Sequence, residues 1–330
     1  MDPTEKCSRC GRNAKYYQKS SGRYFCDKCF IFYFERKMAR TISKYRLIEE
    51  DDSICLGISA GKDSLVMLYG IYQYNLKHHQ ENPIIGVIID EGIEGYRLEA
   101  VQYVHRFMKK HQLRFNLIET SFQEHFGKTL AEMVGIIEKN DLNMNPCTVC
   151  GTIKRHILNK VAMQKGATKL AIGHNMDDII QTLIQNIIRN DLDKIGKNLP
   201  HKSSELDLNN GKKKKRYFIP RIKPLSRLSE HEIIKYCQFK GFNPIKELCP
   251  YSLNYPIFRR RIKNFLDTFE KNNHEVKYNL LNIHYRLYDL LKEQNRMEPQ
   301  KFNYCESCGQ PTGSKRKICH YCELKRLFDV

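Results

Sequence analysis

The segment from Gly57 to Ser64 combines a glycine-containing turn with one lysine, one aspartate and two serines, a composition suited to binding an anion. An apolar run, Ile54–Ile58, precedes the turn, and an apolar-periodic run follows it. A strand, a polar turn and a helix start in this order direct backbone N–H groups and the positive end of a helix dipole at the anion. Because Asp63 follows Lys62 and the spacer is one residue short, the segment is not a Walker A loop. An ordinary strand-to-helix turn is the alternative.

Eight of the thirteen cysteines form two sets with metal-ligand spacing. Each set consists of two Cys-x-x-Cys pairs, and one set lies near each end of the chain. Four thiolates favour a closed tetrahedral zinc site, which leaves no coordination position open and is therefore structural. The expected ligands are Cys7, Cys10, Cys26 and Cys29 for the first zinc ion, and Cys305, Cys308, Cys319 and Cys322 for the second.

Five cysteines remain outside these sets. Cys147 and Cys150 form an internal Cys-x-x-Cys pair just before a helical pattern, and Cys249 precedes a proline. An internal pair of this kind is a redox pair or half of a zinc site, whereas the Cys-Pro ending resembles iron–sulfur ligand runs. Cys55 and Cys237 lie within apolar patterns and are most simply small core residues.

The charge balance indicates a polyanionic partner. Lys and Arg number 56 against 37 Asp and Glu, which leaves a net charge of +19 over 330 residues. Nucleic acid is the usual partner of such a surface, and a lysine-rich surface that serves solubility is the alternative. We expect no membrane span and no signal peptide, because no long apolar run occurs. A cytoplasmic location, where cysteines stay reduced, fits the metal-type spacings.

The hydrophobic pattern predicts an α/β fold with a doubly wound parallel sheet, because apolar strands alternate with amphipathic helices. The expected domains are an N-terminal zinc finger (1–30), a linker helix (31–52), a catalytic domain (53–249), a basic helical region (250–300) and a C-terminal zinc finger (301–330). A polar insert at 206–216 is a solvated loop or a nucleic-acid contact. The expected strands are 53–58, 83–89, 114–119 and 169–173, and the expected helices are 31–48, 64–79, 95–111, 150–166, 177–189 and 229–241.

Four features together resemble a known family. They are the Ser-Ala-Gly-Lys-Asp-Ser loop, the internal Cys-x-x-Cys pair, the Gly-His-Asn-Met-Asp-Asp segment that begins at Gly173, and the cysteine pairs at both ends. The loop resembles that of the PP-loop ATP pyrophosphatases. The combination resembles the archaeal and eukaryotic cytosolic tRNA 2-thiolation enzymes, relatives of the bacterial tRNA 2-thiocytidine synthetases. Ala60 departs from the family pattern, which usually has a second glycine there.

The resemblance implies a site. It implies that Cys147, Cys150 and Cys249 hold a [4Fe-4S] cluster with one open iron, and a persulfide on Cys147 or Cys150 is the alternative. Asp63 and Asp178 are candidate Mg²⁺ ligands, because Mg²⁺ prefers carboxylate and phosphate oxygens. His174 is a base or a turn-stabilising residue. The catalytic residues would be Cys147, Cys150, Cys249, Lys62, Asp63 and Asp178, and the ATP-binding residues Gly57, Ile58, Ser59, Gly61, Lys62, Asp63, Ser64, Ile89, Lys154, Gly173 and Asp178.

The implied reaction is ATP-dependent 2-thiolation of a tRNA uridine, at the wobble position or, alternatively, in the T-loop. Adenylation makes the C2 oxygen a good leaving group, and sulfur then displaces AMP. Lys62 would offset charge on the phosphates, and Lys154 would reach the α-phosphate. The implied partners are tRNA, a ubiquitin-like thiocarboxylate carrier or inorganic sulfide as sulfur donor, and a second copy of the chain in a homodimer.

Two other classes of protein have to be weighed against this enzyme. One is a zinc-dependent RNA-binding or scaffold protein that has lost activity, which the retained Lys62, Asp63 and Ser64 argue against. The other is a PP-loop enzyme that activates a small amide or acid. The positive charge, the run Arg259–Arg261 and the two cysteine modules favour RNA over such a substrate.

Overall fold

The computed structural model describes residues 5–78, 81–95, 98–191, 194, 199–202, 217–245, 249–251, 258–293, 302–313 and 315–330. The insert expected at 206–216 lies outside these residues. None of the described helices combines the length and the apolar character needed to cross a membrane.

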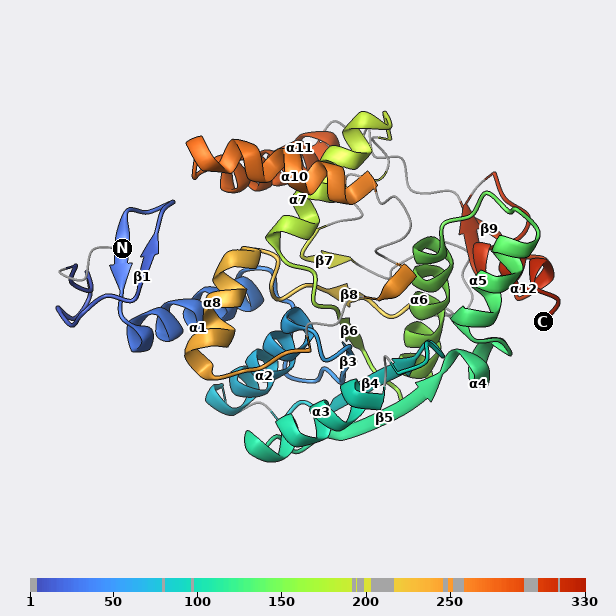
Figure 1. Ribbon diagram of the computed structural model, residues 1–330, viewed down its shortest axis with the longest axis horizontal. Helices are drawn as coiled ribbons and strands as arrows, with labels where there is room; N and C mark the ends of the chain where they lie inside the picture. Colours follow the sequence, from blue (N-terminus) through green and yellow to red (C-terminus); the bar gives the residue numbers. More distant parts are fainter. Residues whose placement is uncertain are drawn as a thin grey trace.

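A six-stranded sheet forms the centre of the molecule (Figure 1). Its strand order is β5-β4-β3-β6-β8-β7, in which the first five strands run parallel and β7 is an antiparallel edge. The doubly wound parallel sheet predicted from the sequence is confirmed. The strands β7 and β8 were not predicted, because a strand of two residues is too short to show an alternating pattern of apolar and polar residues. The bounds are β3 Ile54–Ile58, β4 Ile84–Asp90, β5 Asn116–Ser121, β6 Lys169–Ala171, β7 His201–Lys202 and β8 Arg221–Ile222.

The strand order reverses between β3 and β6. From β3 the chain moves to β4 and β5 on one side, and later to β6 and β8 on the other. Loops that leave two such strands diverge, which opens a crevice at their carboxyl ends. The segment after β3 contains Lys62, and the segment after β6 contains Gly173, so the two sequence motifs meet at this point of the sheet.

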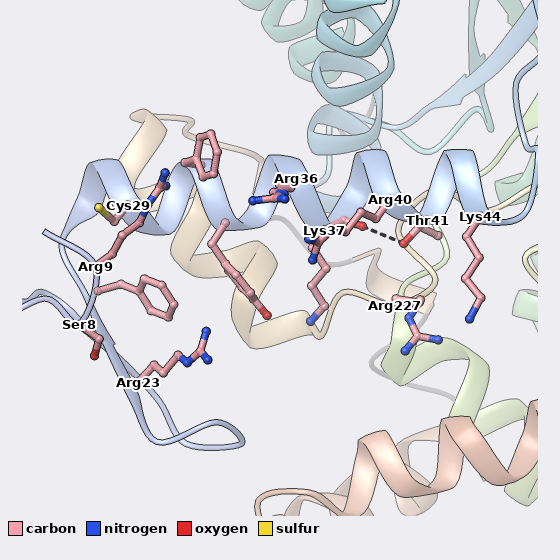
Figure 2. A pocket seen from close by; sticks show the side chains of 13 residues that line it. Ser8, Arg9, Arg23, Cys29, Arg36, Lys37, Arg40, Thr41, Lys44 and Arg227 are labelled. Atoms are coloured by element: carbon pink, nitrogen blue, oxygen red, sulfur yellow. Dashed lines mark hydrogen bonds between the residues drawn. The ribbon is translucent and has the colours of Figure 1, made fainter.

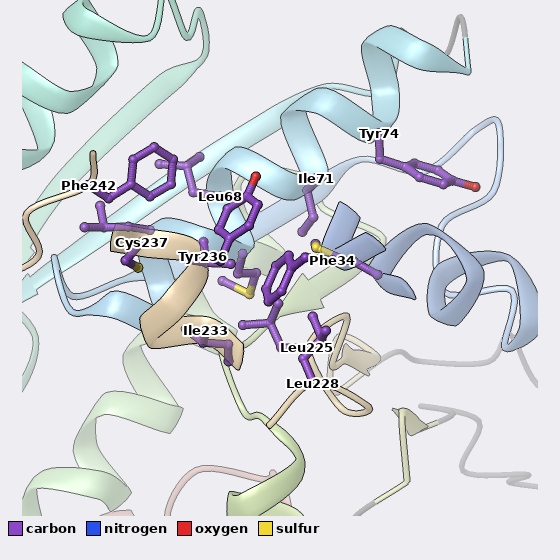
Figure 3. Packing of buried hydrophobic residues seen from close by; sticks show 14 of the residues in the cluster. Phe34, Leu68, Ile71, Tyr74, Leu225, Leu228, Ile233, Tyr236, Cys237 and Phe242 are labelled. Carbon is purple, nitrogen blue, oxygen red and sulfur yellow. The ribbon is translucent and has the colours of Figure 1, made fainter. Parts of the chain in front are cut away.

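Four helices cover one face of the sheet: α1 (Asp27–Lys44), α2 (Lys62–Lys77), α3 (Leu98–Lys110) and α8 (Glu230–Lys240). Side chains of Ile54, Leu56 and Ile58 point to this face, because alternate residues of a strand face opposite sides. Figure 3 shows Phe34 of α1 beside Tyr236 of α8, and their rings stack with centroids 4.1 Å apart. Cys237 is buried in the same cluster, as the sequence predicted.

The opposite face carries α4 (Phe122–Phe126), α5 (Leu130–Lys139), α6 (Pro146–Gln164) and α12 (His320–Leu327). Cys55 points to this face and is fully buried, which confirms it as a core residue. The helices α4 and α5 were missed in the sequence. The α5 helix begins with a capping box, in which Thr129 and Glu132 bond each other's backbone N–H groups. This Thr-x-x-Glu signal was available in the sequence.

A third cluster joins α7 (Met176–Ile188) to a helical pair formed by α10 (Phe258–Asn272) and α11 (Val276–Glu293). Lys277 of α11 fastens this pair to α7, because its buried ammonium group lies 2.7 Å from Asp177. The side chains of Asp267 and Glu270 also bond Lys277, at 3.0 and 2.6 Å. The basic region predicted to be helical thus forms a hairpin over the start of α7.

Each cysteine module contains a two-stranded antiparallel sheet: β1 (Tyr16–Gln18) with β2 (Arg23–Phe25), and β9 (Phe302–Tyr304) with β10 (Pro311–Gly313). Figure 1 shows the modules at opposite ends of the long axis. The first helix begins at Asp27 rather than at Ile31, because Cys26 is its N-cap and the second cysteine pair leads directly into it. The N-terminal module is therefore continuous with α1.

Candidate active site

Hydrogen bonds of Ser59 and Ser64 fix the conformation of the loop after β3. Ser64 donates a hydrogen bond to the carbonyl oxygen of Gly61 at 2.9 Å, and it accepts bonds from the backbone and side chain of Ser59, both at 3.2 Å. The N-cap of α2 is Gly61, which has no side chain to cap the helix. Leu65 donates the first N–H bond back to Gly61. The backbone N–H groups before it are therefore available to an anion at this helix terminus.

Ala60 has a left-handed backbone conformation, with φ of 61°. A β-carbon in this region crowds the following carbonyl group, which costs roughly 1–2 kcal/mol. Ala60 is fully buried, and its carbonyl oxygen accepts a hydrogen bond from the Ile245 N–H at 3.2 Å. The departure noted in the sequence thus falls at the position of this loop where glycine has a conformational advantage.

Lys62 lies between two carboxylates. Its ammonium group is 2.9 Å from Asp63 and 3.1 Å from Glu230, which is the first residue of α8. Although burial opposes its charge, Asp63 and Glu230 raise the pKa of Lys62 above the ordinary lysine value. Burial raises the pKa of Asp63, and the Lys62 charge opposes that rise. Lys62 is therefore a fixed positive charge beside the helix terminus.

Asn175 joins the two motifs at the switch point. Its amide group donates a 2.9 Å hydrogen bond to Asp63, and its side-chain oxygen accepts a 3.1 Å bond from the backbone of Asp178. The Asp178 carboxylate accepts a 3.0 Å hydrogen bond from the Asn175 N–H, which completes a capping box at the start of α7. This box places both candidate magnesium ligands around one asparagine. Burial raises the pKa of Asp178 as well.

Two cations of α10 reach this group of carboxylates. Arg259 bonds the side chain of Asp178 at 2.8 Å, and Lys263 bonds Glu230 at 2.6 Å. Residues four apart share a face of a helix, whereas adjacent residues do not. The run Arg259–Arg261 is therefore not one RNA-facing unit as expected from the sequence, because Arg259 points inward and also bonds Gln181 at 2.8 Å.

Gly173 allows the second motif to approach the first closely. A β-carbon at this position would lie 3.2 Å from the backbone carbonyl carbon of Asp63. The next residue, His174, lies in the loop between β6 and α7. Desolvation by the surrounding walls, together with cations such as Lys223 and Arg259, lowers the pKa of His174. Its ring is therefore neutral at pH 7, and no hydrogen bond joins it to another described residue.

The internal cysteine pair lies at the start of α6. Asn145 caps this helix through a 2.9 Å bond to the N–H of Cys147, and Pro146 occupies its first turn. Cys249 lies close enough that its charge helps to raise the pKa of Cys147, although burial is the larger cause. Burial raises the pKa of Cys150 to about 11. All three predicted ligands are partly buried, and Cys150 and Cys249 pack against the same core beneath α6.

The three-cysteine set differs in spacing from a single-ion site. Its sulfur atoms are not gathered within 4.8 Å of one another, whereas those of each four-cysteine set are. Thiolates that bind different irons of a cluster are held farther apart than thiolates that share one ion. Positive charges from Lys154 and Arg260 partly offset the burial that raises the pKa of Cys147. Cysteine thiolates are the donors that iron–sulfur clusters use, so the chemistry of the donor set fits such a cluster.

Arg260 is an exposed residue in the first turn of α10. It follows Arg259 directly in α10, and Arg259 bonds Asp178. The charge of Arg260 opposes the rise in the pKa of Cys147 that burial causes.

Lys154 lies one helical turn after Cys150, as expected, and forms an ion pair with Glu91. Glu91 follows β4 and is almost completely buried, with 1% of its side chain exposed, whereas Lys154 remains about one third exposed. A buried carboxylate needs a cation, so Glu91 fixes the position of Lys154. Lys154 is thus neither a free surface lysine nor hidden from the crevice.

Both four-cysteine sets are assembled in the structure. Within each set the ligand sulfur atoms lie within 4.8 Å of one another. The Cys10–Cys26 and Cys308–Cys319 separations are 3.6 and 3.7 Å. A Zn–S distance of about 2.3 Å in a tetrahedron gives sulfur–sulfur edges of about 3.8 Å. The geometry therefore fits one zinc ion in each module.

The remaining predicted nucleotide-binding residues lie in the strands that border the crevice. Gly57 and Ile58 end β3, and Ile89 lies near the end of the adjacent β4. Gly57 lies against Leu158 of α6, since a β-carbon there would be 3.2 Å from the Leu158 side chain.

Sequence reasoning missed Asn175, Glu230 and Glu91 as parts of this site. Asn175 carried a usable signal, because Asn followed three residues later by Asp resembles an N-terminal capping pair. Glu230 and Glu91 carried none. Their contacts with Lys62 and Lys154 join residues far apart in the chain.

Comparison with known proteins is consistent with this geometry. Residues 6–31 match the model described as the N-terminal LIM domain of the 2-thiouridine synthetase TtuA. Residues 32–267 match the PP-loop domain. The second match covers most of the chain and includes the loop after β3 and the three cysteines.

Several relatives match nearly the whole chain. A probable sulfurtransferase of Methanocaldococcus jannaschii is 36% identical over 318 residues, which cover 96% of this chain and 86% of the relative. The tRNA 2-thiolation protein NcsA of Haloferax volcanii is 29% identical, with 97% and 98% of the two chains covered. The cytoplasmic tRNA 2-thiolation protein 1 of Drosophila mojavensis is 28% identical, with 98% and 87% covered.

A solved structure also matches. It is the U34-tRNA thiolase NcsA from Methanococcus maripaludis with its [4Fe-4S] cluster. The TM-score is 0.77 at 30% identity, and the match covers 98% of this chain and 96% of the other. With a PP-loop match over most of its length and a relative above 30% identity along nearly all of it, this chain belongs to the PP-loop family of tRNA 2-thiolation enzymes.

Proposed function

We propose that this protein is a tRNA-uridine 2-sulfurtransferase that uses ATP to adenylate the C2 oxygen of the uridine and then replaces that oxygen with sulfur. The first step forms a bond between the C2 oxygen and the α-phosphorus and releases pyrophosphate. In the second step hydrosulfide attacks C2 and AMP leaves with the oxygen. The observation that carries the proposal is the bonding of Asp63 and Asp178 to one side chain, Asn175, which joins the phosphate-type loop after β3 to the start of α7.

The loop supplies the first step. The N–H groups at the start of α2 would bind the pyrophosphate end of ATP, and Lys62 would offset the charge that develops on it. Asp63 and Asp178 would hold Mg²⁺, which requires Lys62 and Arg259 to turn from these carboxylates toward the phosphates. Lys154, held by Glu91, would reach the α-phosphate from the cysteine side.

The cysteines serve the second step. A [4Fe-4S] cluster held by Cys147, Cys150 and Cys249 would supply an open iron at which hydrosulfide is held as the nucleophile. Support comes from the donor set and from the cluster in the Methanococcus maripaludis relative.

The proposed target is the wobble uridine, because that structural relative is described as a U34-tRNA thiolase. A T-loop uridine is the competing target, and inorganic sulfide or a carrier thiocarboxylate is the sulfur donor to be tested. We also propose that each four-cysteine module binds one zinc ion and that the protein forms a homodimer.

The test uses the full chain, prepared and reconstituted without oxygen, with a tRNA transcript, Mg-ATP and sulfide. Pyrophosphate release and 2-thiouridine in digested tRNA are measured together. Lys62→Ala should lower both by about a hundredfold or more, because one preorganised charge is lost. Lys77→Ala is the matched control, since Lys77 lies at the other end of α2 and is exposed.

Two outcomes would overturn the proposal. Pyrophosphate release that needs no tRNA would identify an enzyme acting on a small amide or acid. An absence of both products in the reconstituted wild-type protein, despite tRNA binding, would identify an inactive RNA-binding protein. Replacement of uridine 34 by cytidine in the transcript separates the two target positions.

A further inference from the structure

A groove of about 870 Å³ lies on the far side of α1 from the sheet, where the N-terminal cysteine module meets this helix. Figure 2 shows Arg23 of the β2 strand at one end of the groove and Arg227 at the other. The crevice described above does not include these residues.

The groove has a strong excess of positive charge. Seven of its thirteen lining residues are Arg or Lys, and none is Asp or Glu. Lys37 is balanced by the buried Glu232, which lies 2.8 Å from it. No carboxylate among the described residues pairs with Arg23, Arg36, Arg40 or Lys44. Such an excess is costly to hold together, so it indicates an anionic occupant.

Three of these cations form a row with an aromatic ring. Phe32, Arg36, Arg40 and Lys44 are spaced four residues apart along α1, and residues at this spacing share one face of a helix. All four side chains are exposed. At about 1.5 Å per residue, the row extends roughly 18 Å, which is suited to a chain of charges rather than to a single anion.

The first member of the row provides a stacking surface. Phe32 is 47% exposed, and the guanidinium group of Arg9 lies 3.9 Å from the centre of its ring. Unpaired nucleic-acid bases stack on aromatic rings and on arginine planes. A protein partner of acidic character would use the cations but has no particular need of this pair.

The far end of the groove leads toward the crevice. Arg227, which bonds the Tyr45 hydroxyl group at 3.4 Å, is three residues before Glu230. Glu230 bonds Lys62, and its N–H bonds Asp177 at the start of α7. A chain lying along the groove is therefore directed at the residues around Lys62.

We propose that this groove binds the phosphodiester backbone of the tRNA substrate, with Arg36 and Arg40 contacting phosphates and Phe32 with Arg9 stacking an unpaired base. The inference rests on the proposed function, because it names where that site's substrate lies.

The experiment measures binding of a fluorescently labelled tRNA transcript to the full-length protein without ATP, between about 50 and 200 mM salt. Arg36→Ala with Arg40→Ala should weaken binding about tenfold or more at low salt and reduce the salt slope by about 2, one for each lost phosphate contact. Arg36→Lys with Arg40→Lys should restore the slope. Phe32→Ala should weaken binding at all salt concentrations without changing the slope.

The matched control is Arg106→Ala with Lys109→Ala, which removes two exposed charges from α3. It should bind tRNA like the wild type. In the thiolation assay the groove variant should raise KM for tRNA and keep kcat, because the residues around Lys62 are unchanged. Zinc content and thermal melting should match the wild type in every variant.

Wild-type binding by the groove variant would overturn the inference, as would an equal loss in the α3 control. It would also be overturned if the groove variant kept its tRNA affinity but lost dimerisation or binding of an acidic carrier protein. Each of these outcomes leaves the proposed function standing, provided that the wild type thiolates tRNA. If the wild type neither binds nor thiolates tRNA, the proposed function itself fails.

Discussion

Single residues set the shape of the loop after β3, and Ala60 shows how. Its left-handed backbone is held by burial and by the Ile245 hydrogen bond, not by its own preference. Strain of this kind persists only where the surroundings determine the conformation. The loop therefore depends on the packing around it.

Ala60→Gly should leave the free energy of unfolding within about 0.5 kcal/mol of the wild type. Relief of the left-handed strain offsets the lost methyl burial and the greater freedom of glycine in the unfolded chain. Ala39→Gly in α1, where the backbone is helical, should cost about 1 kcal/mol. Urea unfolding measures both, and equal losses would show that Ala60 carries no strain.

Cys249→Ser should abolish 2-thiouridine formation as fully as Cys147→Ser, although Cys249 lies about a hundred residues farther along the chain. Two thiolates leave two irons of the cluster without a protein ligand, so iron should be lost while zinc is retained. Cys237→Ala, in the opposite core, is the control and should keep thiolation. A folded Cys249→Ser variant that thiolates at a comparable rate would favour a persulfide on the internal pair.

At the scale of elements, three helices contribute the residues of the candidate site. The α2 helix presents its N-terminus, α6 carries the cysteine pair and Lys154, and α10 bonds Asp178 through Arg259. The α6 helix also holds the C-terminal module, because His156 stacks on Tyr321 with ring centroids 3.5 Å apart and planes 7° apart.

The burial of His156 in this contact should make the free energy of unfolding depend on pH. Burial, with nearby cations such as Lys160, lowers the pKa of His156 to about 4, below the ordinary value of about 6.5. Between these values the unfolded chain binds more protons, so the free energy of unfolding falls as the pH falls from about 6.5 to 4. His156→Phe keeps a ring that can stack on Tyr321 but cannot bind a proton. The melting temperature of this variant should therefore fall less than that of the wild type as the pH falls from about 6.5 to 4. An identical pH profile in the variant would assign the effect to other groups, including the nearby His125.

At the scale of the whole molecule, the two cysteine modules pack into the cores on opposite faces of the sheet. Cys7, Cys26 and Cys29 belong to the core shared by α1, α2 and α8, whereas Cys305 and Cys322 belong to the core beneath α6. The modules are therefore parts of the two main cores, not separate appendages.

Cys10→Ser and Cys308→Ser should each remove one of two zinc ions and lower thermal stability, because metal binding contributes directly to folding. Cys10 and Cys308 are exposed, so the substitutions disturb packing little. Metal analysis and thermal melting measure the effect. Limited proteolysis should cut first near the N-terminus in Cys10→Ser and near the C-terminus in Cys308→Ser. Two retained zinc ions would contradict the four-thiolate assignment.

The sequence determined the local features of this protein. The Cys-x-x-Cys spacings, the strand periodicity around Ile54–Ile58 and the Lys-Asp-Ser order are properties of short segments, and each was identifiable before any contact was known. The doubly wound sheet followed from the alternation of strands and helices. The short helix α4 and the strands β7 and β8 were missed, because elements of two to five residues are too short to show a periodic pattern.

Only the tertiary structure decided which residues meet. Asn175 bonds Asp63 across 112 positions of the chain, and Glu230 reaches Lys62 only because α8 packs beside α2. Arg259 looked like part of an RNA-binding run, yet helical geometry turns it inward to Asp178 while Arg36 and Arg40 remain exposed. Ion pairs and hydrogen bonds act over a few ångströms in space, so sequence separation carries no information about them, and the packing of the helices on the sheet determines them.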